Sequence, residues 1–185
     1  MKVNNDNKKL MKNIKQSMFP KKESKTTNET IIVAPHLDDE IIGCYEILIN
    51  ENIKPIIIYS DFSDDKRRSE SLTLRNYVEL KGQIFMDSIP ANLIDKTNTY
   101  YFPNPIYETH PLHRIKGISG EGLLRNGFNV IFYSTEMNYH AKYECKDPKG
   151  KRDLLNKVYP SQSNLWKYEN KFWLFSCYEK WLINI

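Results

Sequence analysis

One stretch of this 185-residue chain, residues 31–43, constrains the fold more than any other, and its sequence is IIVAPHLDDEIIG. Four apolar residues lead directly into an imidazole and three carboxylates, and a second apolar run follows. A short, uninterrupted apolar run is typical of a strand that is buried on both faces. Open α/β sheets bind their ligands beyond the carboxyl ends of such strands. We therefore predict a buried strand at 31–34 that delivers His36, Asp38 and Asp39 to a functional site.

The rest of the folded part alternates between apolar runs and stretches of helical periodicity. Strands are expected at 55–60, 83–86 and 129–134, and helices at 40–49, 67–81, 110–125 and 149–157. Gly82 is expected to end the second helix, which would bury Leu72, Tyr77 and Leu80. Residues 87–109 contain three prolines and are interpreted as a long loop with at most one helical turn. This order indicates right-handed βαβ units, and we expect an α/β fold, a three-layer α/β/α sandwich with a mostly parallel, Rossmann-like sheet.

Charge is unevenly distributed along the chain. Eight lysines against one aspartate and one glutamate give residues 1–28 a net charge of +6, whereas residues 29–185 sum to −2. We expect a basic N-terminal segment followed by a single domain over 29–185, whose size and 40% apolar content suit one core. A domain without a basic face is not expected to bind nucleic acid. Two interpretations of the segment stay open, a frayed leader or a short amphipathic helix in weak contact with an anionic membrane surface.

Cysteine usage and hydropathy bear on the compartment. The three cysteines, Cys44, Cys145 and Cys177, form no CxxC pair, and their odd number argues against a disulfide framework. No run of about eighteen or more apolar residues is present, so no transmembrane helix is predicted. The N-terminus lacks the uninterrupted apolar core of a secretory signal. We therefore expect a cytoplasmic protein with reduced cysteines.

The residue types after the first strand suit a hydrolytic metal site. His36 and Asp39 are three residues apart across a strand-to-helix turn, so an imidazole nitrogen and a carboxylate oxygen can converge on one ion. Such a site needs three protein ligands and an open position for water, and either His110 or His113 could supply the third. Asp38 would be the base for the metal-bound water, and the remaining histidine an acid or oxyanion stabiliser. The competing interpretation is that Asp38 or Asp39 only caps the helix.

Three blocks of sequence resemble one known family. Residues 34–43, APHLDDEIIG, look like the signature of the PIG-L/LmbE family of zinc-dependent de-N-acetylases. Arg67 and Glu70, in a predicted helix, are similar to the second block of that family, and residues 109–114, THPLHR, resemble its third block. The blocks follow the family order and cover roughly residues 31–134. The resemblance implies an amide hydrolase that removes an N-acyl group, usually acetyl, from an amino sugar such as N-acetylglucosamine or from its conjugate.

The resemblance also assigns roles to the residues of the site. His36, Asp39 and His113 would bind Zn²⁺, and Asp38 would be the general base that activates a zinc-bound water. His110 would take the place of an acid or of an imidazole that stabilises the oxyanion. Another divalent transition metal stays an alternative, because two imidazoles and a carboxylate suit several ions.

Substrate contacts are less constrained. Arg67 corresponds to the arginine that helps to hold the substrate in the family, with Arg68 as the competing choice. Glu136 and Asn138 follow the strand at 129–134 and are candidate substrate contacts, against turn capping as the alternative. His140 is interpreted as a surface residue. An aromatic groove would suit a sugar, although packing within the loop is the more common role for aromatic residues such as those just before the third block, Tyr100, Tyr101, Phe102 and Tyr107.

The chain departs from the family pattern at three positions. Leu37 replaces a proline, and Gly43 is followed by Cys44 where a second glycine is typical. Leu112 stands where an aspartate commonly precedes the ligand histidine, and without that carboxylate His110 is expected to be a poorer acid. This last departure motivates an alternative function, a catalytically weak homologue that acts as a glycan-binding or metal-binding module.

Overall fold

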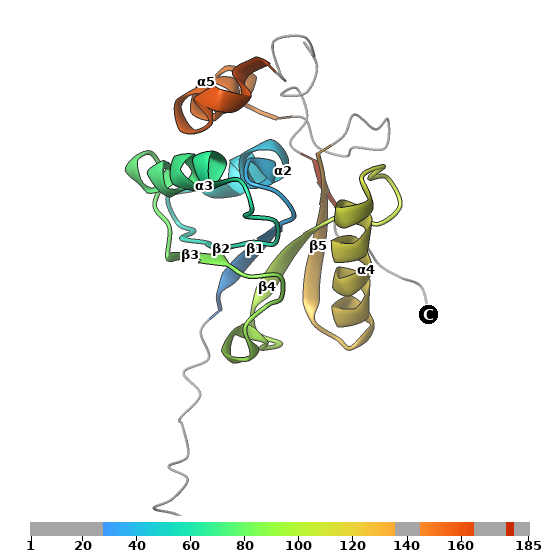
Figure 1. Ribbon diagram of the computed structural model, residues 1–185. Helices are drawn as coiled ribbons and strands as arrows, with labels where there is room; N and C mark the ends of the chain where they lie inside the picture. Colours follow the sequence, from blue (N-terminus) through green and yellow to red (C-terminus); the bar gives the residue numbers. More distant parts are fainter. Residues whose placement is uncertain (1–27, 136–144, 165–176, 180–185) are drawn as a thin grey trace, which may run out of the picture.

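The computed structural model describes residues 28–135, 145–164 and 177–179 (Figure 1). Within these residues the chain forms a six-stranded sheet in the order β3-β2-β1-β4-β5-β6. The first five of these strands are parallel, and β6 pairs antiparallel with β5. The strands are β1 (Thr30–Ala34), β2 (Ile56–Tyr59), β3 (Gly82–Phe85), β4 (Thr99–Pro103), β5 (Asn129–Ser134) and β6 (Cys177–Glu179).

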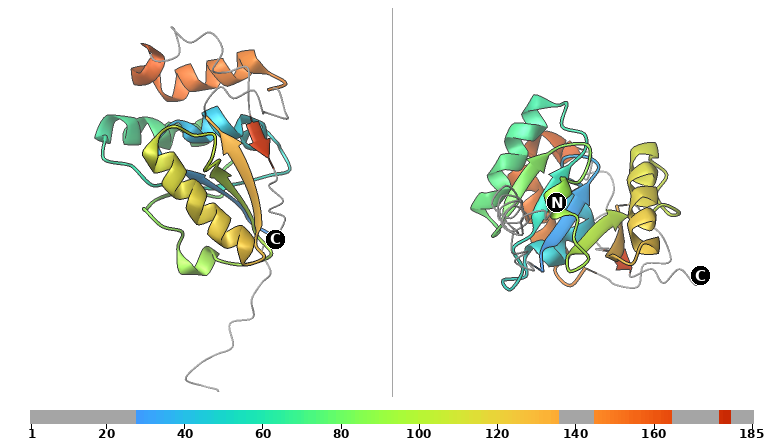
Figure 2. Two further views of the ribbon diagram at one scale, coloured as in Figure 1. Left: turned by 90° about the vertical axis from the view of Figure 1, so that its right-hand side faces the viewer. Right: turned by 90° about the horizontal axis from the view of Figure 1, so that it is seen from below.

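Helices cover both faces of the sheet (Figures 1 and 2). Three of them, α2 (Asp39–Leu48), α3 (Asp65–Ser71) and α5 (Pro148–Val158), lie on one side, and α4 (Pro111–Arg125) lies on the other. Side chains that alternate along β1 feed two separate cores: Ile32 and Ala34 pack toward α2 and α5, whereas Ile31 and Val33 pack on the face that α4 covers. The predicted three-layer α/β/α sandwich with a mostly parallel sheet is confirmed.

Most predicted elements are present with small changes at their ends. The apolar runs at 31–34, 55–60, 83–86 and 129–134 form β1, β2, β3 and β5, and the helices predicted near 40–49, 110–125 and 149–157 are α2, α4 and α5. Among the described residues, no helix is both long enough and apolar enough to cross a membrane.

The predicted helix at 67–81 is wrong in its extent. The α-helix α3 ends at Ser71 and continues only as a 3₁₀ helix, η1 (Leu72–Asn76), while Gly82 belongs to β3. Two hydroxyls at the junction, Ser71 Oγ and Thr73 Oγ1, donate to carbonyls three residues earlier and compete with the α-helical hydrogen bonds. The inward face is thereby shifted: Leu74 is fully buried, whereas the predicted core residues Leu72 and Tyr77 are 39% and 48% exposed.

The predicted loop at 87–109 hides a central strand. Besides a single turn, η2 (Ala91–Leu93), it contains β4, which pairs with both β1 and β5. The aromatic side chains of β4 belong to the core and do not form a sugar platform: Tyr100, Tyr101 and Phe102 are all buried. Helix α4 packs closely on this strand, because a Cβ atom at Gly120 would lie 2.7 Å from the Phe102 ring. Gly117 allows a similar close approach, because a Cβ atom there would lie 2.6 Å from the carbonyl oxygen of Pro103, whereas nothing lies within 4 Å of a Cβ atom at Gly122.

Candidate metal centre

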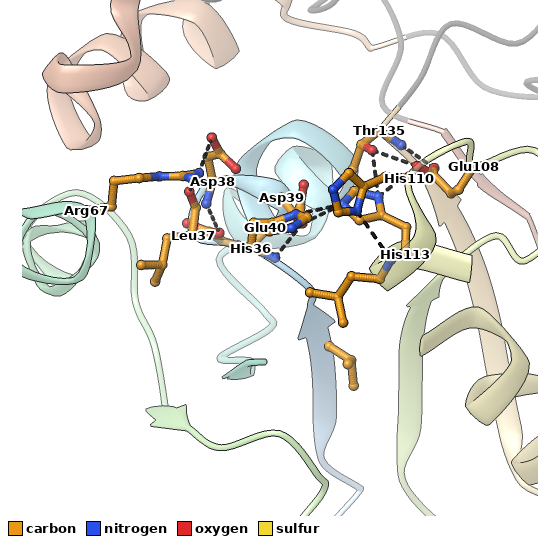
Figure 3. A network of polar contacts seen from close by, with 12 residues as sticks. His36, Leu37, Asp38, Asp39, Glu40, Arg67, Glu108, His110, His113 and Thr135 are labelled. Atoms are coloured by element: carbon orange, nitrogen blue, oxygen red, sulfur yellow. Dashed lines mark hydrogen bonds and ion pairs between the residues drawn. The ribbon is translucent and has the colours of Figure 1, made fainter. Parts of the chain in front are cut away.

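The sequence-predicted site residues that the structure describes gather at the carboxyl edge of the sheet (Figure 3). The β1–α2 turn carries His36, Asp38 and Asp39. Strands β1 and β4 are neighbours, so the connection after β4 brings His110 and His113, the latter on the first turn of α4, to the same place. Residues that lie 77 positions apart in the sequence are thereby in direct contact.

Three candidate ligand atoms form a small triangle. His36 Nδ1 lies 2.9 Å from His113 Nε2, and Asp39 Oδ2 lies 3.3 Å from the first nitrogen and 3.1 Å from the second. A tetrahedral zinc ion with bonds of about 2.0–2.1 Å holds its ligands about 3.3 Å apart. One ion above this triangle could therefore contact all three atoms with little movement of the side chains.

A second ligand set, composed of three histidines, is less compact. The ligand atoms of His36, His110 and His113 lie within 4.8 Å of one another. His110 is exposed, and its ring meets that of His36 edge-on, with the centroids 4.5 Å apart. The described residues thus offer two candidate ligand sets, which share His36 and His113 and differ in whether Asp39 or His110 is the third member.

A buried carboxylate supports His113 from behind. Glu108 Oε2 lies 2.8 Å from His113 Nδ1, and the same carboxylate accepts hydrogen bonds from the backbone N–H and the hydroxyl of Thr135, at 2.7 and 2.8 Å. If Nδ1 donates to Glu108, the lone pair of Nε2 faces the triangle, which is the tautomer that a metal ligand needs. Sequence reasoning missed Glu108 and Thr135, although a glutamate five residues before a ligand histidine was an available signal.

The electrostatics of the triangle favour a cation. Burial lowers the pKa of His113, but the nearby Asp39 and Glu108 carboxylates outweigh burial and raise the pKa to about 10. Burial raises the pKa of Asp39, yet the charges and hydrogen bonds of His113 and His36 hold it well below its usual range. Two buried carboxylates flank one imidazole, so a positive charge at this position is stabilised, whether a proton or a metal ion supplies it.

The β1–α2 turn is held by hydrogen bonds among residues 36–40. The backbone N–H of His36 donates to Asp39 Oδ2 at 2.7 Å, and the N–H of Asp38 donates to Glu40 Oε2 at 3.1 Å. Asp38 occupies the N-cap position of α2 without a side-chain capping bond, so the capping interpretation is wrong for its carboxylate. Its φ of 133° is a conformation that L residues rarely adopt. This backbone turns the carboxylate away from the helix that it precedes.

Arg67 holds the Asp38 side chain. Its Nη2 donates to Asp38 Oδ2 at 2.8 Å and also to the carbonyl of Leu37. Burial and the adjacent Asp39 charge raise the pKa of Asp38 well above its ordinary value, although Arg67 opposes this rise. Arg68 instead lies over the Phe85 ring, with its guanidinium carbon 4.9 Å from the ring centroid. Of the two arginines that the sequence left as alternatives, Arg67 is therefore the one that contacts the site.

His110 is placed by the start of α4. It is the N-cap residue of this helix, and its Nδ1 accepts a hydrogen bond from the N–H of Leu112 at 3.3 Å. In the neutral ring that bond leaves the proton on Nε2. Leu112, which replaces the usual aspartate, is half-buried. The other predicted contacts, Glu136 and Asn138, and the predicted surface residue His140 lie outside the described residues.

Comparison with known proteins finds similarity among solved structures. No protein-family model matches the chain, and no curated protein matches its sequence. A similar solved structure is that of N,N'-diacetylchitobiose deacetylase from Pyrococcus horikoshii in complex with its inhibitor MPG. The two share a TM-score of 0.58 and 15% sequence identity over 97% of this chain and 92% of that chain. At this identity the match supports the fold that the two proteins share.

Proposed function

We propose that this chain is a metal-dependent hydrolase that removes an N-acyl group, acetyl in the first instance, from an amino sugar or its conjugate. One observation carries the proposal: His36, Asp39 and His113 form a ligand triangle of 2.9–3.3 Å beside Asp38, a carboxylate held by an arginine. The set of two imidazoles and one carboxylate suits Zn²⁺, with another divalent transition metal as the alternative.

Two further lines of support point to the same chemistry. The three sequence blocks that resemble the PIG-L/LmbE family converge in space, since Arg67 of the second block contacts Asp38 of the first, and His113 of the third contacts His36. The protein with the similar fold is a deacetylase named for N,N'-diacetylchitobiose, an N-acetylated amino sugar. We infer the substrate class from this name together with the family resemblance.

Each residue of the centre has a step that it can perform. A divalent ion on His36, Asp39 and His113 would supply a Lewis acid that polarises the amide carbonyl and lowers the pKa of water. Asp38 would accept a proton from the attacking water as its oxygen bonds to the carbonyl carbon. The proton that Asp38 takes from water would pass to the departing amine as the C–N bond breaks, which releases acetate and the amine. The Nε2–H of His110 would donate a hydrogen bond to the carbonyl oxygen as that oxygen gains negative charge.

Arg67 would serve both the base and the substrate. Its Nη2 orients Asp38, and its Nε is a buried donor that has no hydrogen-bond partner among the described residues. An unpaired buried donor is costly unless a ligand uses it. The Nε atom is closed to solvent, but the side chain as a whole is 21% exposed, so a sugar hydroxyl or the acyl oxygen would contact its exposed part. We therefore assign Arg67 to substrate binding, and we keep Glu136 and Asn138 as candidate contacts on sequence grounds.

The test is acetate release by the zinc-loaded protein from N,N'-diacetylchitobiose and N-acetylglucosamine, compared with the variant Asp38→Asn. We expect kcat to fall by about 10²–10⁴-fold in the variant, because it loses the general base, while metal content stays the same. Asp153→Asn, an exposed change on α5, is the matched control and should retain full activity.

Two results would overturn the proposal. If the protein bound no divalent metal, the three residues would not form a metal centre and the proposed reaction would have no basis. A protein that binds zinc but releases no acetate from any N-acetylated amino sugar would be a binding module instead, the alternative that Leu112 motivates.

A further inference from the structure

Two carboxylates near the centre are not used by the proposed reaction, and both are held by one short segment. Glu40 follows Asp39 in the first turn of α2, and Glu70 lies one turn after Arg67 on α3. Both accept hydrogen bonds from residues 159–161, the connection between α5 and the single turn η3 (Pro160–Gln162). This segment lies more than a hundred positions after the β1–α2 turn in the sequence, yet the fold places it beside the turn.

The first contact reaches the backbone of Asp38. The Tyr159 hydroxyl donates to Glu40 Oε1 at 2.6 Å, and Glu40 Oε2 accepts the Asp38 N–H at 3.1 Å. Tyr159 and Glu40 are both fully buried. The Tyr159 hydroxyl therefore bonds the carboxylate that accepts the Asp38 N–H, and the buried Tyr59 hydroxyl contacts the same carboxylate.

The second contact reaches the side chain of Asp38. The backbone N–H and the hydroxyl of Ser161 donate to the two oxygens of Glu70, at 3.0 and 2.5 Å. The paired bonds tie α3 to the segment, and one turn earlier the same helix presents Arg67 to Asp38 Oδ2. The arginine that orients the carboxylate is thus held by the same segment that supports the backbone.

We propose that Tyr159 and Ser161 are positioning residues that orient Asp38 for the proposed hydrolysis. The inference deepens the proposed function and rests on it. Asp38 has no capping bond to its own helix, and its φ of 133° must be maintained by surrounding contacts. The hydrogen bonds that maintain its backbone and its carboxylate, through Glu40 and through Arg67, both lead to residues 159–161. A phenylalanine would fill the core at position 159, so the hydroxyl is needed for orientation and not for packing.

The experiment compares Tyr159→Phe and Ser161→Ala in the full-length, zinc-loaded protein. Matched controls are Tyr100→Phe, whose buried hydroxyl bonds Leu93 and Asp95 on the opposite face, and Ser119→Ala on the surface of α4. We expect kcat to fall about tenfold in Tyr159→Phe and in Ser161→Ala, with metal content unchanged, because the base is displaced. KM should stay unchanged in Tyr159→Phe, which acts through Glu40 and not through Arg67. The two controls should retain the wild-type kcat.

A second measurement does not depend on turnover. Hydrogen exchange of the Asp38 amide, relative to the amides of β5, should become about fivefold faster in Tyr159→Phe, because its acceptor Glu40 loses a fixing bond. Exchange at Asp38 that matches the Tyr100→Phe control would overturn the positioning role. If the wild-type protein releases no acetate but the exchange effect is present, the proposed reaction fails while the positioning of Asp38 stands.

Discussion

The β1–α2 turn and the β4–α4 connection face each other across the candidate centre, but they are held in place in different ways. The first is a short turn that closes on itself, since His36 N–H bonds Asp39 and Asp38 N–H bonds Glu40. The second is longer, and its key carboxylate, Glu108, is fixed by the backbone and hydroxyl of Thr135 at the end of another strand. The candidate ligands His36 and Asp39 are therefore joined by a local bond, whereas His113 depends on a carboxylate that is fixed by tertiary contacts.

This difference predicts how each side of the centre responds to single substitutions. Asp39 Oδ2 is tied to the His36 N–H within the turn, so these two candidate ligands should keep their positions when a distant partner is lost. Asp38 differs from them, because Arg67 holds its carboxylate and Tyr159 supports its backbone through Glu40. A connection fixed by tertiary contacts should transmit changes made far away in the sequence. The four predictions that follow test this contrast between the two sides.

The largest effect is expected from removing one ligand on each side. Asp39→Ala and His113→Ala should each reduce metal content from about one ion per chain to nearly none, because two ligands do not hold a zinc ion in a closed site. The metal-free variants should differ in stability. His113→Ala leaves Glu108 buried without an opposite charge and should cost about 3 kcal/mol, against about 1 kcal/mol for the lost hydrogen bonds of Asp39→Ala.

Metal analysis and urea unfolding of the metal-free proteins measure both quantities. His110→Ala is the matched control, because His110 lies outside the compact triangle and its loss should leave metal content unchanged. Full metal content in Asp39→Ala together with loss in His110→Ala would show that the three histidines, and not the predicted set, bind the ion.

The next largest effect is expected at Glu108, the carboxylate that supports His113 in the β4–α4 connection. Glu108→Gln keeps the shape of the side chain but removes the charge that orients His113 through its Nδ1. Metal affinity should fall by about 10–100-fold, as is usual for groups that orient a ligand from behind. A chelator competition titration measures this change. Glu121→Gln, which alters a surface pair with Arg125 on the same helix, should bind metal as tightly as the wild type does.

The same contrast explains what could be predicted from the sequence. The polar residues of the β1–α2 turn follow one another in the sequence, so their chemistry could be predicted from one stretch. The apolar run before them correctly predicted β1 and the parallel sheet. On the other side only the histidines were visible. The role of Glu108 depends on Thr135, 27 positions away, and the strand that carries the connection, β4, was hidden among prolines and tyrosines. Local pattern does not encode such partners, because strand pairing and burial decide them.

The backbone of Asp38 provides the third prediction. Asp38→Gly and Asp38→Ala lose the same carboxylate, but only glycine adopts a φ near 133° without strain. The glycine variant should therefore be more stable than the alanine variant by about 1 kcal/mol. The matched pair at the next position, Asp39→Gly and Asp39→Ala, should show the opposite order, since Asp39 begins a helix. Equal stabilities of the two Asp38 variants in urea unfolding would show that the local turn stores no backbone strain.

The smallest effect is expected at Thr135, which fixes Glu108 through two bonds. Thr135→Val keeps the size of the side chain and the backbone N–H bond of 2.7 Å, but it removes the hydroxyl that donates to Oε2 at 2.8 Å. Losing one of several bonds to a buried carboxylate should destabilise the protein by about 1 kcal/mol and weaken metal binding only a few-fold, less than Glu108→Gln does. Chelator competition on both variants measures the ranking. If Thr135→Val weakened metal binding as much as Glu108→Gln, the hydroxyl would act on His113 directly, from its 3.1 Å distance to Nδ1, and not through the carboxylate.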